Sequence, residues 1–166
     1  MSELTLAGEN GSISRLARAG AEDEISELLA FVSDGELYAV ELHSVHEIVI
    51  PPPITMVPRS PPAVLGVCSV RGELATVVDL RIVLDLPAVL SDKKRILLAR
   101  VGGVELVGLL VDEVRQVVRL KAAQVELSSQ GLGGEMSEAV RGVGRPSADE
   151  VIVILDLVSV LAKGCR

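Results

Sequence analysis

Residues 77–84 read Val77-Val78-Asp79-Leu80-Arg81-Ile82-Val83-Leu84, and the pattern returns near the end of the chain as Ile154-Leu155-Asp156-Leu157-Val158-Ser159-Val160-Leu161. A Val-x-Gly-Val tetrad stands upstream of each copy, at residues 64–67 and 140–143. A hairpin pattern comes before that, at residues 29–40 and 97–108. Self-similarity in a fixed order indicates a duplicated structural unit. The sequence therefore predicts two similar β modules in one body, which favours a docking platform over a single catalytic cleft.

The composition is typical of a folded, strand-rich protein. The 166 residues are 49% hydrophobic, and with one Phe, one Tyr and no Trp the core must be built from Val, Leu and Ile. A net charge of −7 argues against a nucleic-acid binder and against attraction to anionic lipid. The two cysteines form no disulfide framework, and there is no secretory signal and no apolar run of membrane-spanning length. We therefore expect a cytoplasmic protein without nucleic-acid partners and without direct membrane insertion.

The first module is predicted over residues 26–86, after a flexible leader over residues 1–25. Strands are expected at residues 27–32 and 37–42, turning at Asp34-Gly35, then at 45–50 before Pro51-Pro52-Pro53, and at 65–70 and 73–78, turning at Arg71-Gly72. Asp79 is expected to cap a helical turn over residues 80–84, because a carboxylate can accept from the free amides at a helix start.

The second module is predicted over residues 94–163 in the same order. Strands are expected at residues 95–101 and 104–111 across Gly102-Gly103, at 114–120, and at 139–143 and 150–155 across Arg145-Pro146, with a Gly- and Ser-rich loop at 128–137. Asp156 is expected to cap a final helix that ends at Ala162. Many short strands punctuated by Gly and Pro are typical of sandwiches or barrels, and the two modules could exchange their end strands.

Four blocks of the sequence carry a family resemblance. Residues 66–81 read Gly-Val-Cys-Ser-Val-Arg-Gly-Glu-Leu-Ala-Thr-Val-Val-Asp-Leu-Arg, with Val45-His46-Glu47-Ile48 before them and Gly108-Leu109-Leu110-Val111-Asp112-Glu113-Val114 after them. Together with Ile154-Leu155-Asp156-Leu157, these blocks resemble the CheW family of chemotaxis coupling proteins. The resemblance runs from about Glu27 to Leu161, and four blocks in register over one domain rarely coincide by chance.

The resemblance implies a mainly β fold of two small, intertwined, five-stranded antiparallel β-barrels packed side by side across a hydrophobic seam, with short helical turns and a C-terminal helix. It also implies an adaptor that couples transmembrane chemoreceptors to a histidine autokinase in a signalling array. The kinase's regulatory domain, of the same fold, would meet the adaptor barrel to barrel. The receptor's hairpin tip would lie in a groove on the adaptor, and the paired barrel faces would allow self-association.

The resemblance also points to partner-binding residues. Glu47 and Arg71 match positions where the family carries a Glu and an Arg important for coupling, and Gly72 completes that turn. We expect the two charged residues to form an ion pair, which could equally serve only to join two strands. Other matching positions that the family associates with partner contact are Val45, Ile96, Gly108 and Val117. For each of these four residues, ordinary core packing is the alternative.

The sequence departs from the family pattern at Ser69, where an Asn is usual, and in the Pro51-Pro52-Pro53 run and the long leader. No arrangement of nucleophile and base is visible, Gly131-Leu132-Gly133-Gly134 lacks the strand-to-helix context of a phosphate loop, and His43 and His46 have no further ligands nearby. We therefore expect no enzyme, no catalytic residue, no metal and no cofactor. Two alternatives stay open: a competitor that occupies the kinase's adaptor site without binding receptors, and a small β-barrel enzyme with Asp79 and Asp156 as its carboxylates.

Overall fold

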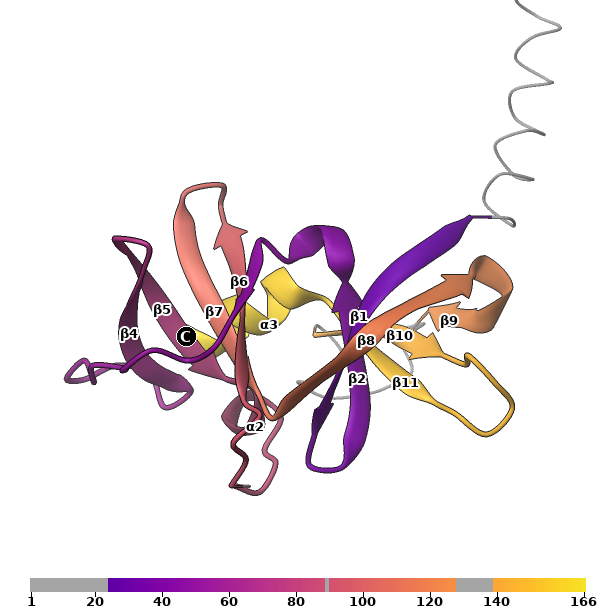
Figure 1. The fold of residues 1–166 in the computed structure, drawn as a ribbon, viewed down its shortest axis with the longest axis horizontal. Coiled ribbons are helices and arrows are strands. Elements are labelled where there is room, and N and C mark those ends of the chain that lie inside the picture. The colour runs from indigo at the N-terminus through magenta and orange to yellow at the C-terminus, as the bar shows by residue number, and fades with distance from the viewer. Residues whose placement is uncertain (1–23, 89, 128–138) are drawn as a thin grey trace, which may run out of the picture.

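Two β-sheets dominate the computed structural model, which describes residues 24–88, 90–127 and 139–166 (Figure 1). The six-stranded sheet has the order β8-β1-β2-β11-β10-β9, with β1 (Ile25–Ser33), β2 (Glu36–Glu41), β8 (Glu113–Lys121), β9 (Val125–Leu127), β10 (Val140–Gly144) and β11 (Ile152–Leu155). The five-stranded sheet has the order β3-β6-β7-β5-β4, with β3 (Glu47–Val49), β4 (Val64–Val70), β5 (Glu73–Asp79), β6 (Arg95–Val101) and β7 (Glu105–Val111).

Short helical segments connect and cover these strands. They are α2 (Leu80–Val83), α3 (Leu157–Gly164) and the 3₁₀ turns η1 (Leu42–Ser44) and η2 (Ala122–Gln124). In the described part of the chain, no helix combines the length and the apolarity needed to cross a bilayer. The predicted leader, apart from Glu24 and Ile25, and the predicted Gly-rich loop at 128–137 lie outside the described residues.

The predicted mainly β architecture is confirmed, and so are three of its tight turns. Both central residues have a positive φ in each turn: Asp34 (51°) and Gly35 (73°), Arg71 (50°) and Gly72 (80°), and Gly102 (62°) and Gly103 (76°). Two successive positive φ angles define a type I′ turn, whose twist matches the twist of paired strands. Local sequence therefore fixes the register of these three hairpins.

Each sheet combines a hairpin from one half of the chain with strands from the other half. Hairpin β1–β2 pairs with β8 and β11, whereas hairpin β6–β7 pairs with β3 and β5. In both sheets the strand that leads into a helix runs parallel to the second strand of the hairpin, β11 beside β2 and β5 beside β7. The strands β8-β1-β2-β11-β10 of one sheet therefore correspond, position by position, to β3-β6-β7-β5-β4 of the other, as the sequence repeat leads us to expect.

Two details refine the expected pair of five-stranded antiparallel barrels. Each sheet contains the parallel pair just described, and β9 gives one sheet a sixth strand. In the five-stranded sheet, a single bridge between Thr55 and Val67 takes the place of β9, with backbone hydrogen bonds of 2.8 and 2.9 Å. Because each of these segments follows a strand at one edge and pairs at the opposite edge, both sheets curl back on themselves.

The duplication extends to single atoms. The amide of Asp79 donates to Ala63 O, and the amide of Asp156 donates to Ala139 O, each at 2.8 Å. Gly66 approaches the Thr55 carbonyl, and Gly142 approaches the Glu126 carbonyl, so closely that an added Cβ would overlap the oxygen. The two Val-x-Gly-Val tetrads are thus equivalent sites at which a closing segment crosses a hairpin.

The core is divided into three clusters by the alternation of side chains along the strands. The largest, which we call the seam, lies between the two sheets and includes Leu29 and Phe31 of β1, Leu97 of β6 and Leu157 of α3. Helix α3 packs on β5, β6 and β7 and lies between the two sheets (Figure 1). Neighbouring residues on the same strands, such as Leu28 of β1, fill the interior of one sheet instead. Several central strands are therefore apolar on both faces.

Ser33 is the one fully buried residue of β1 with a polar side chain, and among the described residues its Oγ has no hydrogen-bond partner. A buried, unsatisfied hydroxyl costs about 1–3 kcal/mol in desolvation. We therefore expect Ser33→Ala to raise the free energy of unfolding by about 1 kcal/mol, measured by urea denaturation with circular dichroism. A loss of stability would mean that the hydroxyl has a partner in solution.

Candidate functional site

The Glu47–Arg71 ion pair spans the gap between the two edges of the five-stranded sheet. Arg71 Nη2 lies 2.5 Å from Glu47 Oε1, with 82% of the Arg71 side chain and 24% of the Glu47 side chain exposed. Glu47 begins β3, at one edge, and Arg71 forms the turn between β4 and β5, at the other. An exposed ion pair contributes about 0–1 kcal/mol to stability. The pair therefore shapes the rim of this sheet more than it holds the fold together.

A second ion pair at the same rim escaped the sequence analysis. Arg100 Nη1 and Nη2 donate to the two carboxylate oxygens of Glu73 at 2.7 and 3.0 Å, and Nη1 also donates to Val104 O at 3.2 Å. The hydrogen bonds from Arg100, together with its positive charge, lower the pKa of Glu73. The same hydrogen bonds raise the pKa of Arg100. The sequence held one sign of this pair: Glu73 follows the Arg71-Gly72 turn directly, and Arg100 precedes Gly102-Gly103, so both residues lie at the ends of predicted hairpins.

The other matched positions divide into interior and surface residues. Ile96 is fully buried, and a Cβ added to Gly108 would overlap its Cγ2 atom, so these two meet in the interior of the five-stranded sheet. Neither can touch a partner directly in this conformation, and core packing accounts for both. Val117, on β8, is 45% exposed, and Val45 is half-buried against the seam. Gly72 is exposed in its turn.

Asp79 and Asp156 cap the two helices. The Asp79 carboxylate accepts from Arg81 N at 3.0 Å, and the Asp156 carboxylate accepts from Ser159 N at 3.1 Å. Each cap also satisfies an amide at the positive end of a helix. The caps follow β5 and β11, which belong to different sheets, so the two carboxylates serve separate helix starts.

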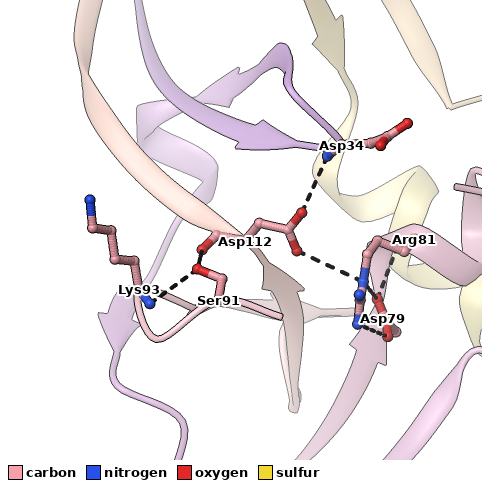
Figure 2. A network of polar contacts seen from close by, with 6 residues as sticks. All are labelled: Asp34, Asp79, Arg81, Ser91, Lys93 and Asp112. Carbon is pink, nitrogen blue, oxygen red and sulfur yellow. Dashed lines mark hydrogen bonds and ion pairs between the residues drawn. The ribbon is translucent and has the colours of Figure 1, made fainter. Parts of the chain in front are cut away.

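Asp79 also belongs to a buried polar network that the sequence analysis did not identify (Figure 2). Arg81, 12% exposed, lies between the carboxylates of Asp79 and Asp112, with Nη2 3.3 Å from Asp79 Oδ2 and Nε 3.8 Å from Asp112 Oδ1. Asp79 and Asp112 are 4% and 6% exposed. The available signal was Asp112 itself, a lone carboxylate after the apolar run Leu106-Val107-Gly108-Leu109-Leu110-Val111.

Hollows on the surface offer little for chemistry. One of about 200 Å³ opens at the end of the six-stranded sheet, lined by apolar Leu28, Val125 and Ile154 and crossed by the ion pair between Arg141 and Glu41. His43 Nε2 lies 3.0 Å from the same Glu41. Burial raises the pKa of the Cys68 thiol, which keeps it in the weakly nucleophilic protonated form.

Comparison with known proteins identifies the family. The model of the CheW-like domain matches residues 27–164. A chemotaxis protein CheW of Thermotoga maritima is 31% identical, covering 81% of this chain and 87% of the relative, and one of Bacillus subtilis is 28% identical, covering 82% and 86%. The crystal structure of the scaffolding protein TtCheW from Thermoanaerobacter tengcongensis superposes with a TM-score of 0.74 at 25% identity, covering 82% of this chain and 92% of that one. The chain therefore belongs to the CheW family of chemotaxis scaffold proteins, which are adaptors and not enzymes.

Proposed function

We propose that this protein couples transmembrane chemoreceptors to a histidine autokinase, as a cytoplasmic adaptor that is recruited to membrane receptor arrays. The observation that carries the proposal is the Glu47–Arg71 ion pair, which lies exposed at the rim of the five-stranded sheet and matches the positions associated with coupling in the family. The contact joins Arg71 Nη2 to Glu47 Oε1 across the two sheet edges, and contacts between ionised groups are stronger than those between neutral groups. The pair would hold β3 and the β4–β5 turn in the arrangement that a partner recognises.

Two surfaces would receive the two partners. The regulatory domain of the kinase would pack against a sheet, barrel to barrel, at the rim that carries Glu47, Arg71 and Gly72. The hairpin tip of the receptor would contact the surface that carries Val45, which is half-buried, and Val117, which is 45% exposed. Ile96 and Gly108 would act indirectly, by keeping β6 and β7 in contact beneath the rim.

Reconstitution tests the proposal. The protein is mixed with its candidate kinase and a cytoplasmic receptor fragment, and co-sedimentation and kinase autophosphorylation are followed together. The proposal requires that the protein bring the other two together and place autophosphorylation under receptor control. Binding to the kinase without the receptor would instead identify a competitor for the adaptor site. Binding to neither would leave the family resemblance as a statement about fold alone.

Arg71→Ala is expected to weaken receptor control of the kinase about tenfold or more, which corresponds to about 1.4 kcal/mol of lost coupling. The midpoint of thermal unfolding should change little, because the pair is exposed. Glu47→Ala should have the same effect, and the charge-swapped double variant Glu47→Arg with Arg71→Glu should restore part of the control. The measurement is receptor-dependent autophosphorylation in the reconstituted mixture.

Arg100→Ala is the matched control, because it removes another exposed ion pair from the same rim without touching the positions matched to coupling. Receptor control should survive in this variant. If Arg71→Ala unfolds the protein, the Glu47–Arg71 ion pair serves to hold the fold together. If Arg71→Ala and Arg100→Ala reduce receptor control of the kinase equally, coupling depends on the total charge at the rim and not on the Glu47–Arg71 ion pair.

A further inference from the structure

Asp112 stands where the chain passes from one sheet to the other. It is the single residue between β7, which ends at Val111 in the five-stranded sheet, and β8, which begins at Glu113 in the six-stranded sheet. Only 6% of it is exposed. A residue at a crossover with so little solvent contact can transmit the position of one sheet to the other.

The contacts of Asp112 reach three further segments (Figure 2). Its Oδ2 accepts from the amide of Asp34, in the β1–β2 turn of the six-stranded sheet, at 3.2 Å. Its Oδ1 lies 3.8 Å from Nε of Arg81, on α2 at the end of the five-stranded sheet. Its backbone oxygen accepts from Ser91 Oγ at 3.0 Å, and Ser91 Oγ in turn accepts from the amide of Lys93 at 3.1 Å. One carboxylate thus faces groups that belong to both sheets.

Arg81 is itself held in a fixed orientation. Its Nε and Nη2 donate to Oδ1 and Oδ2 of Asp79 at 3.4 and 3.3 Å, and its backbone amide donates to the same Oδ1 at 3.0 Å. Asp79 is anchored at the junction of β5 and α2 by its own amide, which donates to Ala63 O at 2.8 Å. The position of Arg81 therefore follows the five-stranded sheet closely.

The seam and this network constrain the sheets in different ways. Apolar contact is non-directional, so a seam of aliphatic side chains favours contact between the sheets without selecting one angle. Hydrogen bonds have preferred distances and angles, so the bond from the Asp34 amide to Asp112 Oδ2 can fix how the β1–β2 turn lies against the end of β7. The ion contact of 3.8 Å between Asp112 and Arg81 adds an attraction towards α2 in the same buried network. We propose that Asp112 is a positioning residue that fixes the orientation of the two sheets relative to each other. The functional consequence, that the sheet orientation would carry the receptor's signal to the kinase, rests on the proposed function.

Distance measurement between spin labels tests the proposal on the protein alone. Cysteines replace Leu74 on β5 and Leu127 on β9, which are 70% and 69% exposed in different sheets, in a Cys165→Ser background. We expect the distance distribution to broaden or shift in Asp112→Ala and, to a smaller extent, in Asp112→Asn, which keeps an acceptor for the Asp34 amide. Asp149→Asn, an exposed change of the same kind in the β10–β11 connection, should leave the distribution unchanged.

Two results would overturn the inference. One is a folded Asp112→Ala variant whose label distances equal those of the parent. The other, if Asp112→Ala does not fold, is an Asp112→Asn variant that folds with unchanged distances. A purely stabilising role would lower the unfolding midpoint and leave the distribution as it was, so melting curves of each variant are recorded alongside.

The reconstituted mixture tests the consequence. We expect Asp112→Asn to bind the kinase and the receptor fragment in pairwise assays as the parent does, while receptor control of autophosphorylation falls about fivefold or more. If the parent protein fails to couple the partners, the proposed function falls, but the label distances still test the role of Asp112. Coupling by the parent together with unchanged distances in the variants overturns only the role of Asp112.

Discussion

Phe31→Ala is expected to lower the free energy of unfolding by about 4 kcal/mol, within the range for a fully buried aromatic side chain. Phe31 is 0% exposed and lies in the seam, where its ring stacks on Tyr38 with centroids 6.1 Å apart. Besides Phe31, the one Phe, Tyr or Trp ring in the chain is that of Tyr38, which already packs in the seam, so no further ring is at hand to fill the space that the removal of Phe31 leaves. Urea denaturation followed by circular dichroism measures the loss.

Two further variants define what the loss means. Phe31→Leu keeps much of the volume and should cost about 1.5 kcal/mol or less, whereas Val104→Ala, at a side chain that is 79% exposed, should change stability by less than about 0.5 kcal/mol. Because the seam joins the two sheets, both should unfold in one transition. A loss near 1 kcal/mol for Phe31→Ala would show that the sheets do not depend on the seam.

The parts of the fold that could be predicted are those that neighbouring residues decide. Asp34-Gly35 and Gly102-Gly103 fix their turns through backbone preferences alone, and Asp79 and Asp156 find amides within three residues of themselves. The repeat then predicted that the same elements occur twice in the same order. Each of these features needs only a few consecutive side chains to form.

The parts that could not be predicted depend on segments far apart in sequence. Thr55 and the three residues of β9 pair where the chain crosses from one sheet edge to the other, and segments this short cannot be recognised as strands from their own sequence. Strand β6 is apolar on both faces, with Ile96 inside the five-stranded sheet and Leu97 in the seam. The alternation of polar and apolar residues therefore could not show which face of the strand packs against the other sheet. The Asp112 network joins residues 78 positions apart.

Motif matching predicted the ion pair of the candidate site, but it did not predict which of the other matched residues are exposed. Glu47 and Arg71 were identified from their place in matched blocks, and the structure brings them together across the sheet edges. Ile96 and Gly108 were expected as possible contact residues, yet they lie inside, because a position matched from a motif says nothing about which way its side chain points. Glu73 and Arg100 were missed because neither stands out in an exposed, charged hairpin end.

Gly66→Ala is expected to lower the free energy of unfolding by about 3 kcal/mol, because it combines overpacking with a strained backbone. Gly66 has a φ of 149°, and an added Cβ would overlap the carbonyl of Thr55, a backbone atom that cannot move without breaking the bridge to Val67. The variant should therefore open the five-stranded sheet at its closing segment. Denaturation gives the magnitude, and hydrogen exchange at the Thr55 and Val67 amides gives the location.

The duplication supplies two matched controls that separate the causes. Gly142→Ala creates the same overlap, with the Glu126 carbonyl, at a residue without a positive φ, and should cost about 2 kcal/mol. Gly72→Ala has a φ of 80° but open space around the new Cβ, so only strain of about 1 kcal/mol is expected. If Gly66→Ala costs no more than Gly72→Ala, the Thr55 segment moves aside freely and does not close the sheet. If Gly66→Ala and Gly142→Ala both exceed Gly72→Ala, close approach of the crossing backbone is what requires glycine at this point in each repeat.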